Sequence, residues 1–418
     1  MKAPRLPRTA AFYLLASIIV GFLAGSSAPT PLYAVYASRW GFSPITTTIV
    51  FGVYALAVLT ALLTVGSLSD HVGRRPVLLA ALAVQVVAMV VFITADGVPQ
   101  LLVARIVQGL STGAAAGAIG AGMLDLNKTR GTIANAVAPI TGSAAGALGS
   151  GLLVQYLPQP THLVYLVLLG VFVLQAIGVL LMPETSSPTP GALASLRPHF
   201  AVPGAVRRPM LFAVPALVAV WAMAGLYGAL GPALVKLVSG SGSVVLGGLS
   251  LFVLAGSGAV AVLLLQRQNA RQLTLIGGGA LLAGIALTLV AVGTRSTAGF
   301  FVGTAIAGVG FGGGFQGAIR SVMPLAAPHQ RAGVLSVVYV VSYLALGLPA
   351  VIAGVLLVHG DNLLHTTVQY GVAVMVLAAL ALLGAIRPTR PAVEPRPERD
   401  EVIEPEQARE MRTAERVI

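Results

Sequence analysis

The chain has 418 residues, of which 56% are hydrophobic and only 9% are charged, and its net charge is +12. A soluble domain normally carries about 25% charged residues, so this composition excludes a water-soluble protein and indicates one that lies in a lipid bilayer. The chain contains no cysteine, which excludes disulfides, thiolate metal sites and cysteine nucleophiles.

Long apolar runs predict the membrane-spanning elements. A helix needs about 20 apolar residues to cross roughly 30 Å of hydrocarbon, whereas the strands of a membrane barrel have about 10 residues that alternate in polarity. The runs here are long and do not alternate, so we predict an all-α membrane protein. Its twelve expected spans are residues 11–37, 44–67, 77–95, 98–123, 133–157, 161–183, 210–236, 243–265, 273–294, 297–319, 332–358 and 363–386.

The first run has two interpretations. A basic start followed by apolar residues and small residues near Ser26 is the pattern of a secretory signal. Eleven further runs follow, however, and this one continues into the aromatic segment "LYAVYASRW". We therefore interpret it as an uncleaved first span, bent at its glycines and prolines because neighbouring helices can accommodate such bends: Gly21, Gly25, Pro29 and Pro31.

Charged residues are concentrated between the second and third runs, in the stretch "GSLSDHVGRRP". Gly66 and Gly73 allow helix ends to approach closely and the chain to reverse in a tight turn. Asp70 can sit at the positive end of a neighbouring helix, such as the span that begins near Ala332, while Arg74 and Arg75 can hold it or bind lipid headgroups. The alternative interpretation is that these charges only fix the orientation of the chain in the membrane.

The fourth run contains a single buried charge. Arg105 falls well inside this span, where an arginine costs roughly 2.5–3.5 kcal/mol to insert, and Gln108 lies on the same side of the helix at i+3. We expect Arg105 to face protein or a solute; the alternative is an arginine that extends to the membrane surface. Glycines also recur at a spacing of four, which favours close helix packing, at Gly109, Gly113 and Gly117, at Gly142 and Gly146, and at Gly308 and Gly312.

A proline-rich connection follows the sixth run and divides the chain. We predict an N-terminal six-helix bundle (1–183), a central cytoplasmic loop (184–209), a C-terminal six-helix bundle (210–386) and a flexible cytoplasmic tail (387–418). The sequences of the two halves are similar at equivalent places. The segment "GSLSDHVGRRPVLLAA" after the second span corresponds to "LLLQRQNARQLTLIGG" after the eighth, in which basic residues remain and the acid is missing. Two parallel halves of six spans each are a known way of building secondary transporters.

Basic residues are spread over alternate loops, which predicts an orientation with both termini in the cytoplasm. The loops expected on that side hold Lys2, Arg5, Arg8, Arg74, Arg75, Lys128, Arg130, Arg197, Arg207, Arg208, Arg267, Arg271, Arg320 and Arg331, and the opposite loops hold only Arg39, Lys236 and Arg295. Because the charge does not form one stripe, we interpret it as membrane topology and expect no nucleic-acid partner.

These motifs resemble those of the major facilitator superfamily. "GSLSDHVGRRP" resembles the family's signature between spans 2 and 3, "RIVQGLSTGAAAG" its fourth-span signature, and "MPET" the common end of its sixth span. The resemblance covers about residues 9–386 and implies the major facilitator fold, with two pseudo-symmetric bundles of six helices. It also implies that the Asp70 cluster latches the two halves together in the outward-facing state, and that Arg105 contacts substrate or relays protons.

The family's pathway helices are the first, fourth, seventh and tenth, and they offer further candidate residues. These are Tyr33, Gln108, Trp221, Tyr227 and Gln316. Eight of the thirteen acids lie in the tail, and the other five, Asp70, Asp96, Asp125, Glu184 and Asp361, map to loops or helix ends. No carboxylate is therefore expected in the middle of the membrane, which argues against a strongly cationic substrate. Proton coupling could use Asp125 or be absent.

We therefore predict a monomeric secondary transporter of the plasma membrane that moves a small organic solute by alternating access. The first expectation is proton-coupled efflux of drug-like or metabolite molecules, as in the family's drug antiporters. Uptake of a sugar or organic anion is the alternative, and a membrane sensor or scaffold is a third. An enzyme is not expected, because the sequence offers no nucleophile and base pair, phosphate loop or metal cluster; no metal or other cofactor is expected either.

Overall fold

The computed structural model describes residues 6–360 and 362–386, and within these ranges the chain forms helices and turns without a strand. Its described part contains twelve spans long and apolar enough to cross a membrane, as predicted. The predictions for Lys2, Arg5, Asp361 and the tail 387–418 lie outside the described residues. The helices are α1 Arg8–Ser27, α2 Pro29–Trp40, α3 Pro44–Val65, α4 Leu68–Val72, α5 Arg74–Ile93, α6 Val98–Leu126, α7 Lys128–Tyr156, α8 Pro160–Leu181, α9 Ala192–Ser195, α10 Gly204–Ser239, α11 Val244–Leu264, α12 Ala270–Gly293, α13 Thr297–Val322, α14 Arg331–Val358 and α15 Leu363–Ile386, with short 3₁₀ turns η1 Met323–Leu325 and η2 Pro328–Gln330.

The first span is interrupted where the sequence predicts a bend. Helix α1 ends at Ser27 and α2 begins at Pro29, and the two together form one span, Arg8–Trp40. Proline has no backbone N–H and its ring clashes with the preceding turn, so the regular ladder cannot continue through Pro29 and Pro31. The predicted start of the seventh span was wrong. Helix α10 begins at Gly204, not after Pro209, and holds Pro209 inside the helix.

The glycine repeats bring helices into backbone contact. Helix α6 lies against α3, because a methyl group at Gly113 or Gly117 would overlap the carbonyl oxygens of Val58 or Gly66. In the same way α7 lies against α1 through Gly142 and Gly146, and α13 lies against α11 through Gly308 and Gly312. The predicted close packing at these repeats is confirmed.

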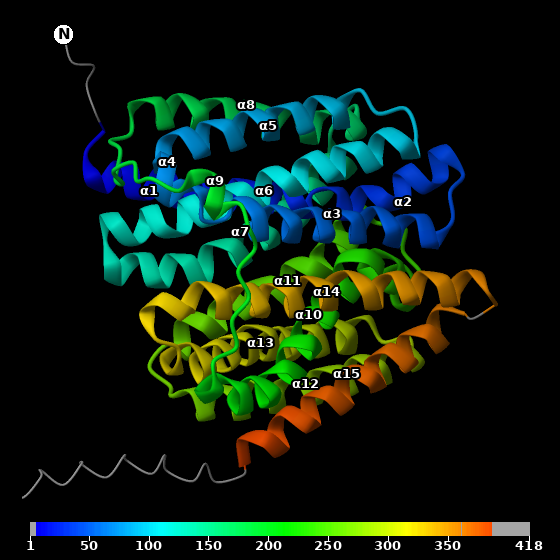
Figure 1. The fold of residues 1–418 in the computed structure, drawn as a ribbon. Coiled ribbons are helices and arrows are strands. Elements are labelled where there is room, and N and C mark those ends of the chain that lie inside the picture. Colours follow the sequence, from blue (N-terminus) through cyan, green and yellow to red (C-terminus); the bar gives the residue numbers. More distant parts are fainter. Residues whose placement is uncertain (1–5, 361, 387–418) are drawn as a thin grey trace, which may run out of the picture. The chain divides into compact units, whose positions relative to one another are not determined.

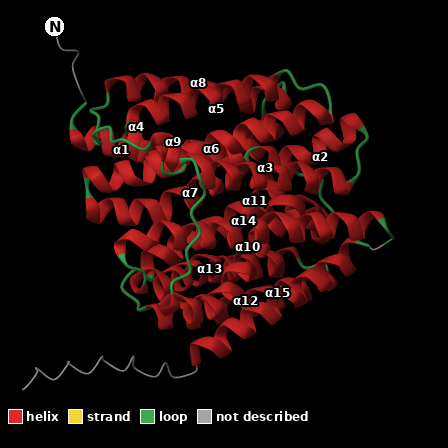
Figure 2. Cartoon of the chain, in the orientation of Figure 1, coloured by secondary structure: helices red, strands yellow, loops and turns green. Residues whose placement is uncertain are grey.

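Three hydrophobic cores fall into two groups of described helices. One core is built from buried residues between Ala11 and Met182, in α1–α8 and the turns beside them. The other two are built mostly from α10–α15, with a few side chains of α3 and α7. We call these groups the first half and the second half; the segment with α9 connects them and runs along the left side of Figure 1, and Figure 2 shows that this segment is mostly loop. The helices up to Ala385 belong to one compact unit, so the predicted division at residues 183 and 209 stays a prediction about folding units.

We call the end of the helical bundle that carries α4 and α9 the linker end, and the opposite end, where α3 begins, the far end (Figure 1). Among the described residues, the direct hydrogen bonds between the two halves lie toward the far end. Thr30 Oγ1 donates to the Gly228 carbonyl at 3.1 Å, and Ser243 Oγ donates to Gln155 Oε1 at 2.7 Å. Gly52 and Gly354 also pack across the halves there, against Val351 and Thr48. The halves are thus held together at the far end.

Candidate functional site

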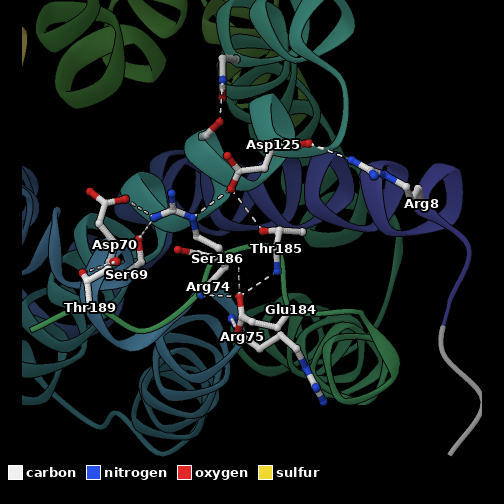
Figure 3. A network of polar contacts seen from close by, with 12 residues as sticks. Arg8, Ser69, Asp70, Arg74, Arg75, Asp125, Glu184, Thr185, Ser186 and Thr189 are labelled. Carbon is white, nitrogen blue, oxygen red and sulfur yellow. Dashed lines mark hydrogen bonds and ion pairs between the residues drawn. The ribbon is translucent and has the colours of Figure 1, made fainter. Parts of the chain in front are cut away.

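The charged turn between α3 and α5 is folded around two glycines. Helix α4 lasts only from Leu68 to Val72, and Gly73 then has φ +101° and ψ 155°, a conformation that only glycine adopts readily. This reversal starts α5 at Arg74 and brings Asp70 and Arg74 onto one side of the turn, as Figure 3 shows. Gly66, which ends α3, lies against Gly117 of α6.

Arg74 is the centre of the cluster. Its side chain is largely buried, with 8% of its area exposed, and it forms ion pairs with Asp70 and, at 3.2 Å, with Asp125 in the last turn of α6. It also donates to Ser69 Oγ at 2.8 Å. Thr185 Oγ1, just after α8, donates to the same Asp125 oxygen at 3.2 Å. The guanidinium therefore joins the turn to the ends of two other spans (Figure 3).

Glu184 caps the start of α5 from another part of the chain. Its carboxylate accepts the backbone N–H groups of Arg74 at 2.8 Å and Arg75 at 3.0 Å, and also those of Thr185 and Ser186. A negative group is stabilised at a helix N-terminus by the unpaired N–H groups and the helix dipole. A methyl group at Gly73 would lie 2.8 Å from Glu184 Oε2, so a side chain there would displace the carboxylate from the N–H groups that it caps, in addition to the strain at this φ. The "MPET" motif marked this region, but not its role as a cap.

Two predicted contacts of this cluster are absent. Arg75 donates to the carbonyls of Val179 and Leu180 at the end of α8 and not to Asp70. Asp70 is 57% exposed and its carboxylate bonds to Arg74, not to the start of α14, where Gly333 packs against Ala201 of the connecting segment. The direct hydrogen bonds between the halves lie toward the far end, away from Asp70 at the linker end.

Arg105 is fully buried inside the first half. One guanidinium nitrogen donates to the Ser26 carbonyl at 2.8 Å and to Gln108 Oε1 at 2.7 Å, and the other donates to the Tyr33 hydroxyl at 2.9 Å. The guanidinium carbon lies 4.5 Å from the centre of the Tyr54 ring, within cation–π range. The structure therefore brings Arg105, Gln108 and Tyr33 together, and Arg105 does not extend to the membrane surface.

The region around Arg105 contains further buried polar atoms. Gln108 Nε2 donates to the Gly25 carbonyl at 2.9 Å, and a methyl group at Gly25 would lie 3.3 Å from Gln85 Nε2 and 3.5 Å from Gln108 Nε2. Neither amide atom of Gln85 nor Arg105 Nε has a hydrogen-bond partner. Sequence reasoning missed Gln85 and Tyr54, because their spacing carries no signal and their roles depend on which helices pack together.

The candidate residues of the second half lie apart from Arg105. Trp221 belongs to an aromatic cluster with Phe315 at 5.6 Å and Tyr343 at 5.4 Å between ring centres. Tyr227 is fully buried, and its hydroxyl is bonded to Thr304 Oγ1 at 2.7 Å within the second half. Its place on the transport pathway stays a prediction.

Gln316 is partly exposed, and its side chain makes no hydrogen bond with another described residue. Acids of the described residues lie at helix ends or loops, as predicted: Asp70 in α4, Asp96 before α6, Asp125 in the last turn of α6 and Glu184 after α8. The described residues contain no group of three side chains that could hold a metal ion.

Comparison with known proteins gives a family and a fold. A family model described as Major Facilitator Superfamily matches residues 13–350. A solved structure of a mutant of the nucleoside transporter NupG is 11% identical, with a TM-score of 0.69 over 91% of this chain and 100% of that one. The NupG structure itself is 12% identical, with a TM-score of 0.65 over 90% of this chain and 97% of that one. No curated protein matches the sequence.

Proposed function

The chain belongs to the major facilitator superfamily, and from this premise we propose that it takes up a small neutral or anionic organic solute across the plasma membrane. Membership makes it a membrane transporter of small solutes rather than an enzyme. The branch, solute and direction are our proposal. It rests on the polar groups around Arg105 and on the uneven contact between the halves.

The observation that carries the proposal is the environment of Arg105. A buried charge is costly unless it is paired, yet the partners of Arg105 are neutral: the Ser26 carbonyl, Gln108 and Tyr33. Its Nε is left without a partner. A solute with acceptor oxygens or a negative charge would complete this set of donors, whereas a cationic solute would meet repulsion without a carboxylate to offset it.

The direction of opening supports transport by alternating access. Contacts between the halves hold the far end closed, and the basic residues of the linker end favour the cytoplasm. We therefore infer that this conformation is open toward the cytoplasm. In the opposite conformation the linker ends would meet, and Asp70 would then reach the N-terminus of α14 and act as a latch, as the family resemblance implies.

Uptake is our first choice because both of the solved structures named above are of a nucleoside transporter. Proton-coupled efflux of drug-like or metabolite molecules is the second candidate, with Asp125 as its proton carrier. Asp125 accepts bonds from Arg74 and Thr185. A pH gradient imposed on vesicles tests this second candidate, since efflux that does not respond to the gradient is not coupled to protons.

The test is uptake of labelled nucleosides, sugars and organic acids into vesicles that contain the protein. Arg105→Ala should reduce transport of the solute by at least about a hundredfold, because it removes three hydrogen bonds from the charged group. Arg208→Ala is the matched control, since Arg208 is exposed at the start of α10. Unchanged transport by a folded Arg105→Ala protein would make Arg105 a structural residue and remove the proposal.

A further inference from the structure

An apolar groove lies between α1, α7 and α11. It has a volume of about 400 Å³ and is lined by Phe12 and Val20 of α1, by residues 130–141 on one side of α7, and by Leu263 of α11. Its walls are accessible, because Ile133 is 39% and Leu263 is 41% exposed. The groove lies in the half of α7 nearest the linker end, outside the Arg105 cluster.

The sequence explains why the groove exists. From Gly142 onward α7 lies in backbone contact with Val20 and Ala24 of α1. Pro139 sits inside α7 just before this contact, and a proline in a helix removes one backbone hydrogen bond and bends the helix. The part of α7 before Pro139 can thus diverge from α1, and small side chains, Ala134 and Ala138, leave the space between them open.

Charge and length restrict what the groove can hold. The α7 wall runs over twelve residues, from Arg130 to Thr141. The eleven steps between them span about 16 Å at 1.5 Å each, which matches half of a hydrocarbon core of roughly 30 Å. Polar side chains of the wall are confined to its ends, Arg130 and Thr141. The Arg130 side chain has no hydrogen bond or ion pair with a described residue; only its backbone N–H is bonded, to Asn127.

We propose that this groove binds one acyl chain of an anionic phospholipid, with the headgroup phosphate at Arg130. A chain with a negative charge at one end and a leaflet's length of hydrocarbon matches the groove in length, polarity and sign. A polar solute would leave its hydrogen-bonding groups without partners in the apolar part. Basic sites between spans are known to hold anionic headgroups.

The test measures how much lipid stays with the protein. The full chain is reconstituted in vesicles of equal parts phosphatidylglycerol and phosphatidylcholine, extracted with mild detergent, and weighed with its bound lipid by native mass spectrometry. We expect about one phosphatidylglycerol per chain. Arg130→Gln should lower that occupancy about fivefold, since one basic residue near a headgroup contributes on the order of 1 kcal/mol, and should leave phosphatidylcholine unchanged. Arg208→Gln is the control, because Arg208 is exposed at the same end of the second half.

A second variant separates the chain from the headgroup. Ala138→Phe fills the groove, so it should lower retention of both lipids; its unfolding temperature and solution size would show that it has folded. Equal phosphatidylglycerol retention in Arg130→Gln and the unchanged protein would overturn the proposal. Undiminished retention of phosphatidylglycerol by a folded Ala138→Phe protein would also overturn it. Displacement of phosphatidylglycerol by a stoichiometric amount of palmitate would overturn it as well, because the occupant would then be a free amphiphile.

Discussion

The turn between α3 and α5 and the turn between α11 and α12 occupy equivalent places in the two halves. In both, the last turn of the half's fourth span reaches back to the turn between its second and third spans. In the first half Asp125 pairs with Arg74, whereas in the second half Arg320 donates to the carbonyls of Gln266 and Gln268, each at 2.9 Å. The same connection is made with an arginine on the turn in the first half and with an arginine on the span in the second half.

The helices that follow these turns also start differently. Helix α12 is capped by its own Asn269, whose side chain and that of Gln272 form a capping box. Helix α5 is capped by Glu184, which lies 110 residues further along the chain. The turn in the second half is therefore held by local bonds, while the turn in the first half depends on residues from several spans. This difference predicts unequal responses to matched substitutions.

The largest effect is expected from Gly73→Ala. A side chain at φ +101° is strained, and its methyl group would meet the Glu184 carboxylate, so the free energy of unfolding should fall by about 3 kcal/mol. Gly240→Ala is the control: Gly240 ends α10 at φ +65° with open space around it, which should cost about 1 kcal/mol. Unfolding in detergent measures both, and equal losses would argue against the clash with Glu184.

Arg74→Met tests the ion pairs. Removing the buried guanidinium leaves Asp125 without its cation. A bond to a charged group contributes about 1.5–3 kcal/mol, and the pair with Asp70 adds little because Asp70 is 57% exposed. We therefore expect a loss of about 2 kcal/mol in the free energy of unfolding. Arg320→Met removes only bonds to two carbonyls from a partly exposed side chain, so about 1 kcal/mol is expected. If the two losses were the same, the ion pairs would add nothing beyond the carbonyl bonds.

Glu184→Ala and Asn269→Ala compare the two caps. Loss of a cap costs about 0.5–2 kcal/mol, and we expect the Glu184 change to lie near the top of that range because its carboxylate accepts four backbone N–H groups. The Asn269 change should lie near the bottom. Glu184→Gln keeps one acceptor oxygen and should recover part of the loss. A larger effect at Asn269, measured by the same unfolding assay, would reverse this order.

The smallest effect is expected from salt. Raising the ionic strength from about 0.02 M to about 0.5 M shortens the screening length, and an exposed pair contributes no more than about 1 kcal/mol. Hydrogen exchange of the turn around Asp70 should therefore become a few-fold faster, while exchange of the turn at Gln266 should change less. Parallel acceleration of both turns would show that the ion pairs do not govern the opening of the first.

Much of the fold follows from composition along the chain. The spans are predicted because each must satisfy its backbone hydrogen bonds within lipid. The close packing of helices is predicted at the glycine repeats because the missing side chain lets two backbones come into contact. Helix starts were less certain: Pro209 suggested a boundary, but α10 begins five residues earlier, at Gly204, since packing against neighbouring helices tolerates a proline within a span.

The candidate site was predicted only where the sequence spacing is short. The pairing of Arg105 with Gln108 follows from their i+3 spacing on one helix. Tyr33 was expected in the pathway but not on the guanidinium, and Tyr54 was not predicted at all. Their positions depend on the packing of α2 and α3 against α6, which no local pattern encodes. For the same reason the burial of Tyr227 on Thr304 could not be foreseen.

Glu184 has a mechanical consequence, because it stands at the point where the connecting segment leaves the first half. Its bonds to the start of α5 attach that tether to two spans instead of one. When the second half rotates, the force that it exerts on the connecting segment is therefore shared between α8 and α5. This force cannot separate α8 from the first half without also breaking the bonds to α5.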